Sequence, residues 1–202
     1  MMQPDQITGL ILAGGRGSRM GGVDKGLQTL NGMTMVAHVI SKLTPQVGAL
    51  MINANRNLDA YAAFGVPVLP DENTDFSGPL AGIQAGLRHC QTPYLVIAPC
   101  DSPFLPVDLV SQLSAAFESA DADLAVAATT VVDQHGDKKQ AQPVFMLLKS
   151  ALITDLTQFL DEGGRKIETW YRRQHYTEVL FADALAFRNI NTPDELREAD
   201  NN

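Results

Sequence analysis

Short apolar runs alternate with amphipathic segments along most of this chain. The apolar runs predict strands at 7–13, 49–53, 66–69, 94–98 and 124–128, and the segments between them predict helices at 35–43, 58–64, 79–89 and 106–119. Strands that are apolar on both faces are typical of a parallel sheet with helices on each side. We therefore expect an α/β, three-layer, Rossmann-like fold with a mostly parallel sheet.

The last third of the chain is less regular. We expect a loop at 131–142, a strand at 144–148, a helix at 150–161 and extended segments at 176–181 and 186–190. Gly163 is placed to end the helix before it, because glycine readily adopts the left-handed conformation there. Thr192 and Glu195 have the spacing of a capping box, with Pro193 at the first helical position, so we expect a final helix to begin there.

The composition is that of an ordinary globular protein, and it excludes several functions. A chain of 202 residues with 45% hydrophobic and 19% charged residues can bury a real core, and we expect a single domain over 1–202. The formal net charge of −8 argues against nucleic-acid binding. No signal peptide and no membrane-spanning run are expected. Cys90 and Cys100 lack zinc-site spacing, so we expect reduced thiols in a cytoplasmic protein.

A glycine-rich, basic loop follows the first predicted strand. Five of the fourteen residues from Leu12 to Lys25 are glycines, and Arg16, Arg19 and Lys25 are positively charged. Glycine lets backbone N–H groups approach a ligand closely, and successive N–H groups in a turn bind anions. Basic side chains add strong hydrogen bonds to phosphate. The loop therefore predicts a nucleotide-phosphate site, with a plain surface loop as the alternative.

Two common phosphate-binding motifs do not match this loop. A P-loop has Gly before its Lys and Ser or Thr after it, whereas Lys25 lies between Asp24 and Gly26. The dinucleotide-binding motif ends in Gly or Ala where this chain has Met20, and it needs an acidic residue about twenty positions later that is absent here. We therefore exclude both a P-loop NTPase and an NAD-binding protein.

Polar residues follow four predicted strands in succession. The glycine loop follows the first, Asn53 the second, Asp71 the third and Asp101 the fourth. Ligands of open parallel sheets bind beyond the carboxyl ends of the strands, so these residues should lie near one another. Mg²⁺ in such sites takes one or two carboxylates together with substrate phosphates. Asp101 is our candidate Mg²⁺ ligand; the alternative, that Asp101 and Asp71 only stabilise turns, stays open.

Taken together, these motifs resemble those of the molybdenum cofactor guanylyltransferases, which belong to the nucleotide-sugar pyrophosphorylase-like nucleotidyltransferases. The matching segments are Leu-Ala-Gly-Gly-x-x-x-Arg-Met-Gly-Gly-x-Asp-Lys (12–25), Asn-Ala-Asn-Arg (53–56), Asp71, Gly-Pro-Leu-Ala-Gly (78–82), Pro-Cys-Asp-x-Pro (99–103) and Asn-x-Asn-Thr-Pro-x-Glu-Leu (189–196). They occur in order over nearly the whole chain. The resemblance is weakest over 131–188.

The resemblance implies a role for each matching residue. The implied nucleotide-binding residues are Leu12, Ala13, Gly14, Gly15, Lys25, Asn53, Asp71 and Asp101. The implied catalytic residues are Asp101, Lys25 and Arg19, with Asp101 also the Mg²⁺ ligand. Further contacts to the base or the acceptor are expected from Gly78, Pro79, Leu80, Asn189 and Asn191. The nucleotide half would occupy about 1–105 and the acceptor half about 106–202.

The implied reaction joins GMP, taken from GTP, to the phosphate of molybdopterin and releases pyrophosphate. The implied cofactor is Mg²⁺. We expect a monomeric enzyme whose protein partners are molybdoenzymes or cofactor-delivery proteins. Three alternatives stay open: CMP transfer to molybdopterin, nucleotide transfer to a sugar phosphate, and a non-catalytic GTP-binding regulatory module. The last is disfavoured because Lys25 and Asp101 are both present.

Overall fold

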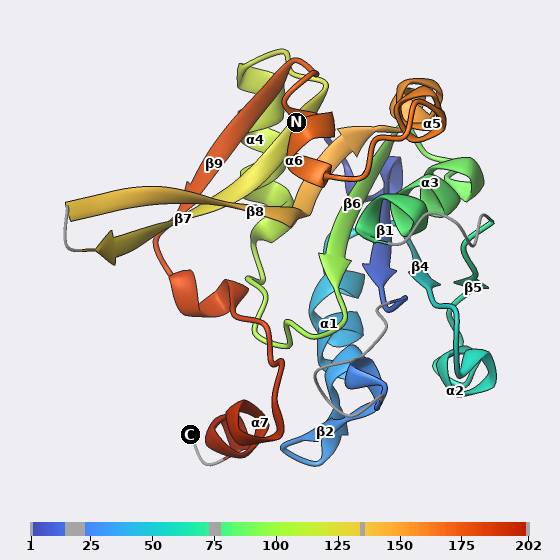
Figure 1. Cartoon of the computed structure of the whole chain (residues 1–202), viewed down its shortest axis with the longest axis vertical. Coiled ribbons are helices and arrows are strands. Elements are labelled where there is room, and N and C mark those ends of the chain that lie inside the picture. The colour runs from blue at the N-terminus through green and yellow to red at the C-terminus, as the bar shows by residue number, and fades with distance from the viewer. Residues whose placement is uncertain (1, 15–22, 73–77, 134–135, 201–202) are drawn as a thin grey trace.

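The computed structural model describes residues 2–14, 23–72, 78–133 and 136–200 and contains a seven-stranded sheet (Figure 1). The strand order is β5-β4-β1-β6-β8-β7-β9. The strands are β1 (Ile7–Leu12), β4 (Ala49–Asn53), β5 (Val68–Leu69), β6 (Tyr94–Pro99), β7 (Leu124–Asp133), β8 (Gly136–Lys149) and β9 (Tyr176–Phe181). The β5–β4–β1–β6 half is parallel, β8 runs antiparallel to β6 and β7, and β9 is parallel to β7. The expected mostly parallel sheet is confirmed.

Helices cover both faces of this sheet. One face is packed by α1 (Met35–Leu43), α2 (Leu58–Ala62) and α4 (Leu109–Ser119), and the other by α3 (Pro79–His89), α5 (Ile153–Asp161) and α6 (Ile167–Tyr171). Short 3-10 helices lie at Pro4–Gln6, Lys25–Leu27, Thr44–Gln46, Ser150–Leu152 and Ala184–Phe187.

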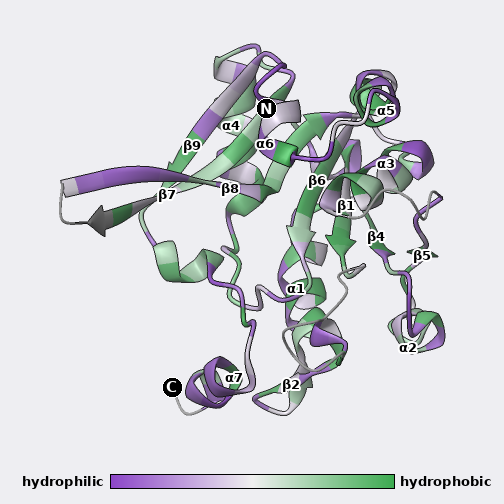
Figure 2. Cartoon of the chain, in the orientation of Figure 1, coloured by the Kyte–Doolittle hydropathy of each residue, from purple (hydrophilic) through white to green (hydrophobic). Residues whose placement is uncertain are grey.

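The central strands are apolar because each serves two cores. In β6, Val96 and Ala98 belong to the core on the α1 and α4 face, whereas Leu95 and Ile97 belong to the core under α3 and α5. All four side chains are fully buried. Since alternate residues of a strand point to opposite faces, a strand with helices on both sides needs apolar residues at every position. Figure 2 shows β1 and β6 as mostly hydrophobic.

The prediction of a loop at 131–142 is wrong. This segment is part of a long hairpin in which Val131 pairs with Lys138 and Thr129 with Gln140. The ribbon extends past the last pairing of β7 with β9, at Thr129, and residues 137–140 of β8 are exposed. A two-stranded ribbon that is exposed on both faces needs no alternation of apolar and polar residues. The polar composition of this segment was therefore wrongly interpreted as a loop. The β-branched residues 129–132 were the overlooked signal.

Smaller differences occur at element ends. The extended segment expected at 186–190 begins instead inside a 3-10 helix, Ala184–Phe187, whose first turn is capped by the carboxylate of Asp183 accepting from the N–H of Leu185 at 2.9 Å. The helix α4 begins at Leu109 rather than at residue 106. Gly163 has a φ of +88°, as expected for the residue that follows a helix end.

The last helix packs against residues 29–35 through a small third core. The short hairpin of β2 (Thr29–Leu30) and β3 (Met33–Thr34) lies beside the last helix, α7 (Pro193–Asp200), as Figure 1 shows. The hairpin, the start of α1 and the C-terminal segment together form this core, whose buried residues are Leu30, Met35, Ile190 and Ala199. The predicted capping box is present, since the N–H of Glu195 donates to Thr192 Oγ1 at 3.2 Å and the N–H of Thr192 donates to Glu195 Oε2 at 3.1 Å. This packing holds residues 189–191 beside Lys25, Asp101 and Ser102.

In the part of the chain that the structure describes, no helix combines the length and the apolar character needed to cross a membrane.

We predict that Ile190→Ala lowers the free energy of unfolding by about 2–4 kcal/mol, because it removes buried methyl groups from this small core and leaves a cavity. Ile190 is 1% exposed. Urea denaturation would measure the change, with Leu185→Ala as the control, since Leu185 is 69% exposed. Equal changes for the two variants would show that α7 is not held by this core.

Candidate active site

The carboxyl ends of four parallel strands lie level with one another. Leu12 at the end of β1 pairs with Asn53 in β4 and with Pro99 in β6, and Asn53 pairs with Leu69 in β5. The strand order reverses between β1 and β6, because β4 and β5 follow β1 on one side whereas β7 to β9 follow β6 on the other. Such a switch point is where open α/β sheets bind ligands. The loops predicted to carry the site therefore do emerge at one edge.

Lys25 lies between Asp101 and Asn191 at this edge. Its ammonium Nζ is 3.3 Å from Asp101 Oδ2 and donates to Asn191 Oδ1 at 2.6 Å. Lys25 begins the 3-10 helix Lys25–Leu27, Asp101 follows β6, and Asn191 lies in the segment before α7. The backbone N–H of Ile190 also donates to the carbonyl of Asp101 at 2.9 Å, which ties the last two segments together.

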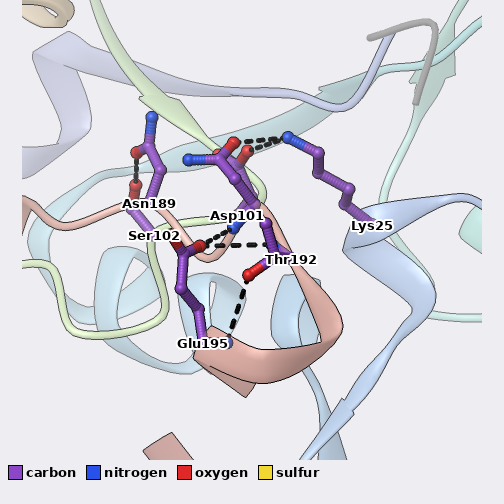
Figure 3. A network of polar contacts seen from close by, with 7 residues as sticks. Lys25, Asp101, Ser102, Asn189, Thr192 and Glu195 are labelled. Atoms are coloured by element: carbon purple, nitrogen blue, oxygen red, sulfur yellow. Dashed lines mark hydrogen bonds and ion pairs between the residues drawn. The ribbon is translucent and has the colours of Figure 1, made fainter. Parts of the chain in front are cut away.

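The segment that carries Asn191 is held from both sides, as Figure 3 shows. Ser102 Oγ, which is fully buried, donates to Asn189 Oδ1. Glu195 Oε2 accepts the backbone N–H groups of Asn191 and Thr192, at 2.6 and 3.1 Å. The capping box of α7 therefore also positions the amide of Asn191, which the sequence had marked only as a base or acceptor contact.

The carboxylate of Asp101 is poorly solvated. Burial raises the pKa of Asp101 above its ordinary value, and the charge and hydrogen bond of Lys25 act in the opposite direction. The side chains of Lys25 and Asp101 are 20% and 15% exposed. A carboxylate in such a place is stabilised strongly by a cation beside it.

Asn53 and Asp71 form a second cluster on the β4 side of the edge. Asn53 Nδ2 donates to Asp71 Oδ1 at 2.8 Å, and Asn55 Nδ2 donates to Asp71 Oδ2 at 2.7 Å. The N–H of Asp71 donates in return to Asn55 Oδ1 at 2.8 Å. Asn55 was not among the predicted site residues, although its position in Asn-Ala-Asn-Arg, two residues after Asn53, could have indicated it.

The backbone packs closely against Asn53 at two glycines, Gly82 and Gly14. A Cβ on Gly82 in α3 would lie 2.3 Å from Asn53 Oδ1, and a Cβ on Gly14 would lie 3.1 Å from the same atom. Asn53 itself is 2% exposed. Any larger residue at position 82 would push α3 away from β4 or displace the amide, so this glycine is needed for the packing of the cluster.

The other predicted residues lie around these two clusters. Leu12 ends β1, Ala13 donates its N–H to the carbonyl of Asn53 at 2.7 Å, and Gly14 follows. Gly78 has a φ of +131° and Pro79 begins α3, whereas the side chain of Leu80 is buried in the core, so only its backbone remains available as a base contact. Gly15 and Arg19 lie outside the described residues.

The two side-chain oxygen atoms next to Lys25 are suitable ligands for a metal cation that binds together with phosphate. Asp101 supplies one carboxylate and Asn191 one amide oxygen. Among the described residues there is no group of three or more His, Cys, Asp or Glu side chains that could hold a metal by itself. One carboxylate and one amide leave most of the six positions of Mg²⁺ to phosphate oxygens and water, which is the usual arrangement in nucleotide enzymes.

Comparisons with known proteins show the family of this chain. A family model described as the MobA-like NTP transferase domain matches residues 9–178. Relatives described as molybdenum cofactor guanylyltransferase include one from Ralstonia nicotianae, 58% identical over 199 residues and 98% of each chain. Another, from Cupriavidus necator, is 60% identical over 197 residues and 98% of each chain.

Solved structures share the fold. The molybdopterin-guanine dinucleotide biosynthesis protein A of Archaeoglobus fulgidus superposes with a TM-score of 0.75 at 24% identity, over 96% of this chain and 97% of that chain. A 4-diphosphocytidyl-2C-methyl-D-erythritol synthase of Anaerococcus prevotii superposes with a TM-score of 0.75 at 11% identity, over 98% of each chain. Both solved structures therefore share the fold of this chain. The chain belongs to the MobA-like NTP transferase family, among the molybdenum cofactor guanylyltransferases.

Proposed function

We propose that this protein transfers GMP from GTP to the phosphate of molybdopterin and releases pyrophosphate. An oxygen of the pterin phosphate attacks the α-phosphorus of GTP, a new P–O bond forms, and the bond from that phosphorus to the pyrophosphate oxygen breaks. The observation that carries the proposal is the grouping of Lys25, Asp101 and Asn191 at the sheet edge, beside the glycine loop. The names of the relatives supply the nucleotide and the acceptor class.

Lys25 and Arg19 would bind the phosphates and stabilise the departing pyrophosphate. Phosphoryl transfer of this kind depends on positioning and on charge stabilisation rather than on a protein nucleophile. The backbone of Leu12 to Gly15 would hold the nucleotide from the other side. Because Asn191 is anchored by Glu195, and Asp101 by the end of β6, the oxygen atoms around Lys25 are held in place before substrate binds.

Asp101 and Asn191 are the residues that would hold Mg²⁺. Both oxygen atoms already lie next to one cation, the ammonium of Lys25, and Asp101 is poorly solvated. Bound there, Mg²⁺ would neutralise charge that develops on the phosphates. Lys25 would then donate to the phosphates while it remains close to Asp101.

Asn53 and Asp71 would contact the nucleoside. Their mutual hydrogen bond, and the bonds of Asn55 to Asp71, hold the amide and the carboxylate in one orientation. Guanine presents N1–H and N2–H donors, which need acceptors of this kind. We expect the Leu12–Gly15 backbone and the Gly78–Leu80 turn to complete the base site, and residues from 106 onward to contribute the pterin site.

The proposed setting of the enzyme is the cytoplasm, where it would act as a monomer and pass the guanine dinucleotide cofactor to molybdoenzymes or delivery proteins. The support is the resemblance to a biosynthetic family and the presence of two free cysteines.

We predict that GTP is preferred over CTP by at least about a hundredfold in kcat/KM, which corresponds to about 2.7 kcal/mol in the transition state. A site built to hydrogen-bond one base leaves its own polar groups unpaired with another. Initial rates of pyrophosphate release with molybdopterin and each nucleotide would measure the preference.

The same assay separates the alternatives. Equal rates with CTP would indicate a cytidylyltransferase, and release only with a sugar phosphate as acceptor would indicate a sugar nucleotidyltransferase. GTP binding without pyrophosphate release would indicate a regulatory module.

We predict that Asp101→Asn lowers kcat by at least about a hundredfold, because it removes the charge that would bind Mg²⁺ and pair with Lys25 while preserving the side-chain shape. Rates over a range of Mg²⁺ concentrations would check this. Asp108→Asn is the control, since Asp108 is an exposed carboxylate seven positions away. Near-normal activity of the Asp101 variant at saturating Mg²⁺ would contradict the metal assignment.

A further inference from the structure

The carboxylate of Asp24, the residue before Lys25, is bonded to α2 and to the residue before that helix. Asp24 Oδ1 accepts a hydrogen bond from the hydroxyl of Tyr61 at 2.6 Å, and Asp24 Oδ2 accepts from Asn57 Nδ2 at 2.9 Å. Tyr61 lies in α2 and is fully buried, and Asn57 is the residue just before that helix. Both oxygen atoms of the carboxylate are therefore bonded to one small helix.

The residue after Lys25 packs against the same tyrosine. A Cβ on Gly26 would lie 2.5 Å from the Tyr61 hydroxyl oxygen and 3.1 Å from Cys100 Sγ. Gly26 is buried, and so is Cys100, which directly precedes Asp101. Tyr61, Gly26 and Cys100 thus form one contact that sets the spacing between the turn that carries Lys25 and the loop that carries Asp101.

Other roles for Asp24 are not favoured by this geometry. It stands at the N-cap position of the 3-10 helix Lys25–Leu27, but its side chain makes no capping hydrogen bond. Burial of Tyr61 raises the pKa of its hydroxyl, so the group remains a neutral donor toward the carboxylate. Each oxygen of the carboxylate accepts a hydrogen bond from the α2 side, whereas the Lys25 ammonium contacts Asp101 and Asn191.

We infer that Asp24 is a positioning residue, which acts with Tyr61 to aim Lys25 at the phosphates of the nucleotide. The inference rests on the proposed function, since it takes the phosphate-binding role of Lys25 from there. Because the contacts of Asp24 and Gly26 fix the backbone on both sides of Lys25, this residue can move only by rotation about its side-chain bonds. Reacting groups that are misplaced by about 1 Å can lose about a hundredfold in rate, so a clamp on the backbone of a phosphate-binding lysine has a functional consequence.

A double-mutant cycle tests this inference. Asp24→Asn and Tyr61→Phe should each lower kcat/KM for GTP at least about tenfold in the otherwise unchanged protein. In a Lys25→Met background the same changes should have less than about a twofold further effect, because a residue that acts through Lys25 has nothing left to position. The affinity for GTP with Mg²⁺, measured by titration calorimetry, should show the same non-additivity.

Two matched controls separate positioning from stability. Asp59→Asn removes an exposed carboxylate from α2, and Tyr171→Phe removes a buried hydroxyl for which no hydrogen-bond partner is present in the described part of the chain. Both should leave kcat/KM within about twofold, the usual scale for changes away from specific features. Melting temperatures of all variants would be recorded alongside.

Additive losses in the two backgrounds would overturn the inference and show a merely structural role. A Lys25→Met variant with unchanged kcat/KM and GTP affinity would overturn it together with the proposed role of Lys25. Absence of guanylyl transfer by the unmodified protein, with GTP binding retained, would contradict only the proposed function; the cycle in GTP affinity would then still decide whether Asp24 positions Lys25.

Discussion

The contact of Lys25 with Asp101 and Asn191 is the interaction on which the site depends, because it joins three segments that are far apart in the chain. Lys25 and Asn191 are 166 positions apart, and Lys25 and Asp101 are 76. The two residues are positioned in different ways. Asp101 follows the end of the buried strand β6, and the backbone N–H of Asn191 is bonded to Glu195 in the cap of α7. The ammonium of Lys25 is well stabilised at their meeting point, and we propose that a metal bound with the nucleotide would be stabilised there too.

The sheet provides the frame for this contact. The aligned ends of β1, β4 and β6 bring the glycine loop, Asn53 and Asp101 to one edge. Glycines at 26 and 82 then allow unusually close packing, one against Tyr61 and Cys100, the other against Asn53. Some of the glycines in this chain are therefore needed because they let neighbouring side chains pack closely against the backbone.

Local patterns predicted much of this and failed in identifiable places. The central strands and the helices on both faces follow from apolar periodicity, and the Thr192 capping box follows from spacing alone. The segment 131–142 was misassigned because a solvated hairpin does not alternate in burial. That Asp71 contacts the nucleotide stays a prediction, and its bonds to Asn53 and Asn55 depend on how β4 and β5 pair.

The sequence by itself determined the α/β class and the family resemblance, and it predicted a phosphate site at residues 12–25, because these depend on residue type and on spacing within short windows. Only the tertiary structure decided which oxygen atoms meet Lys25 and which side chains support it. The docking of α7 on the β2–β3 hairpin brings Asn191 to Lys25, and the packing of α2 brings the Tyr61 hydroxyl into contact with Asp24. Contacts of this kind depend on the packing of whole elements, and no local pattern of residues encodes them.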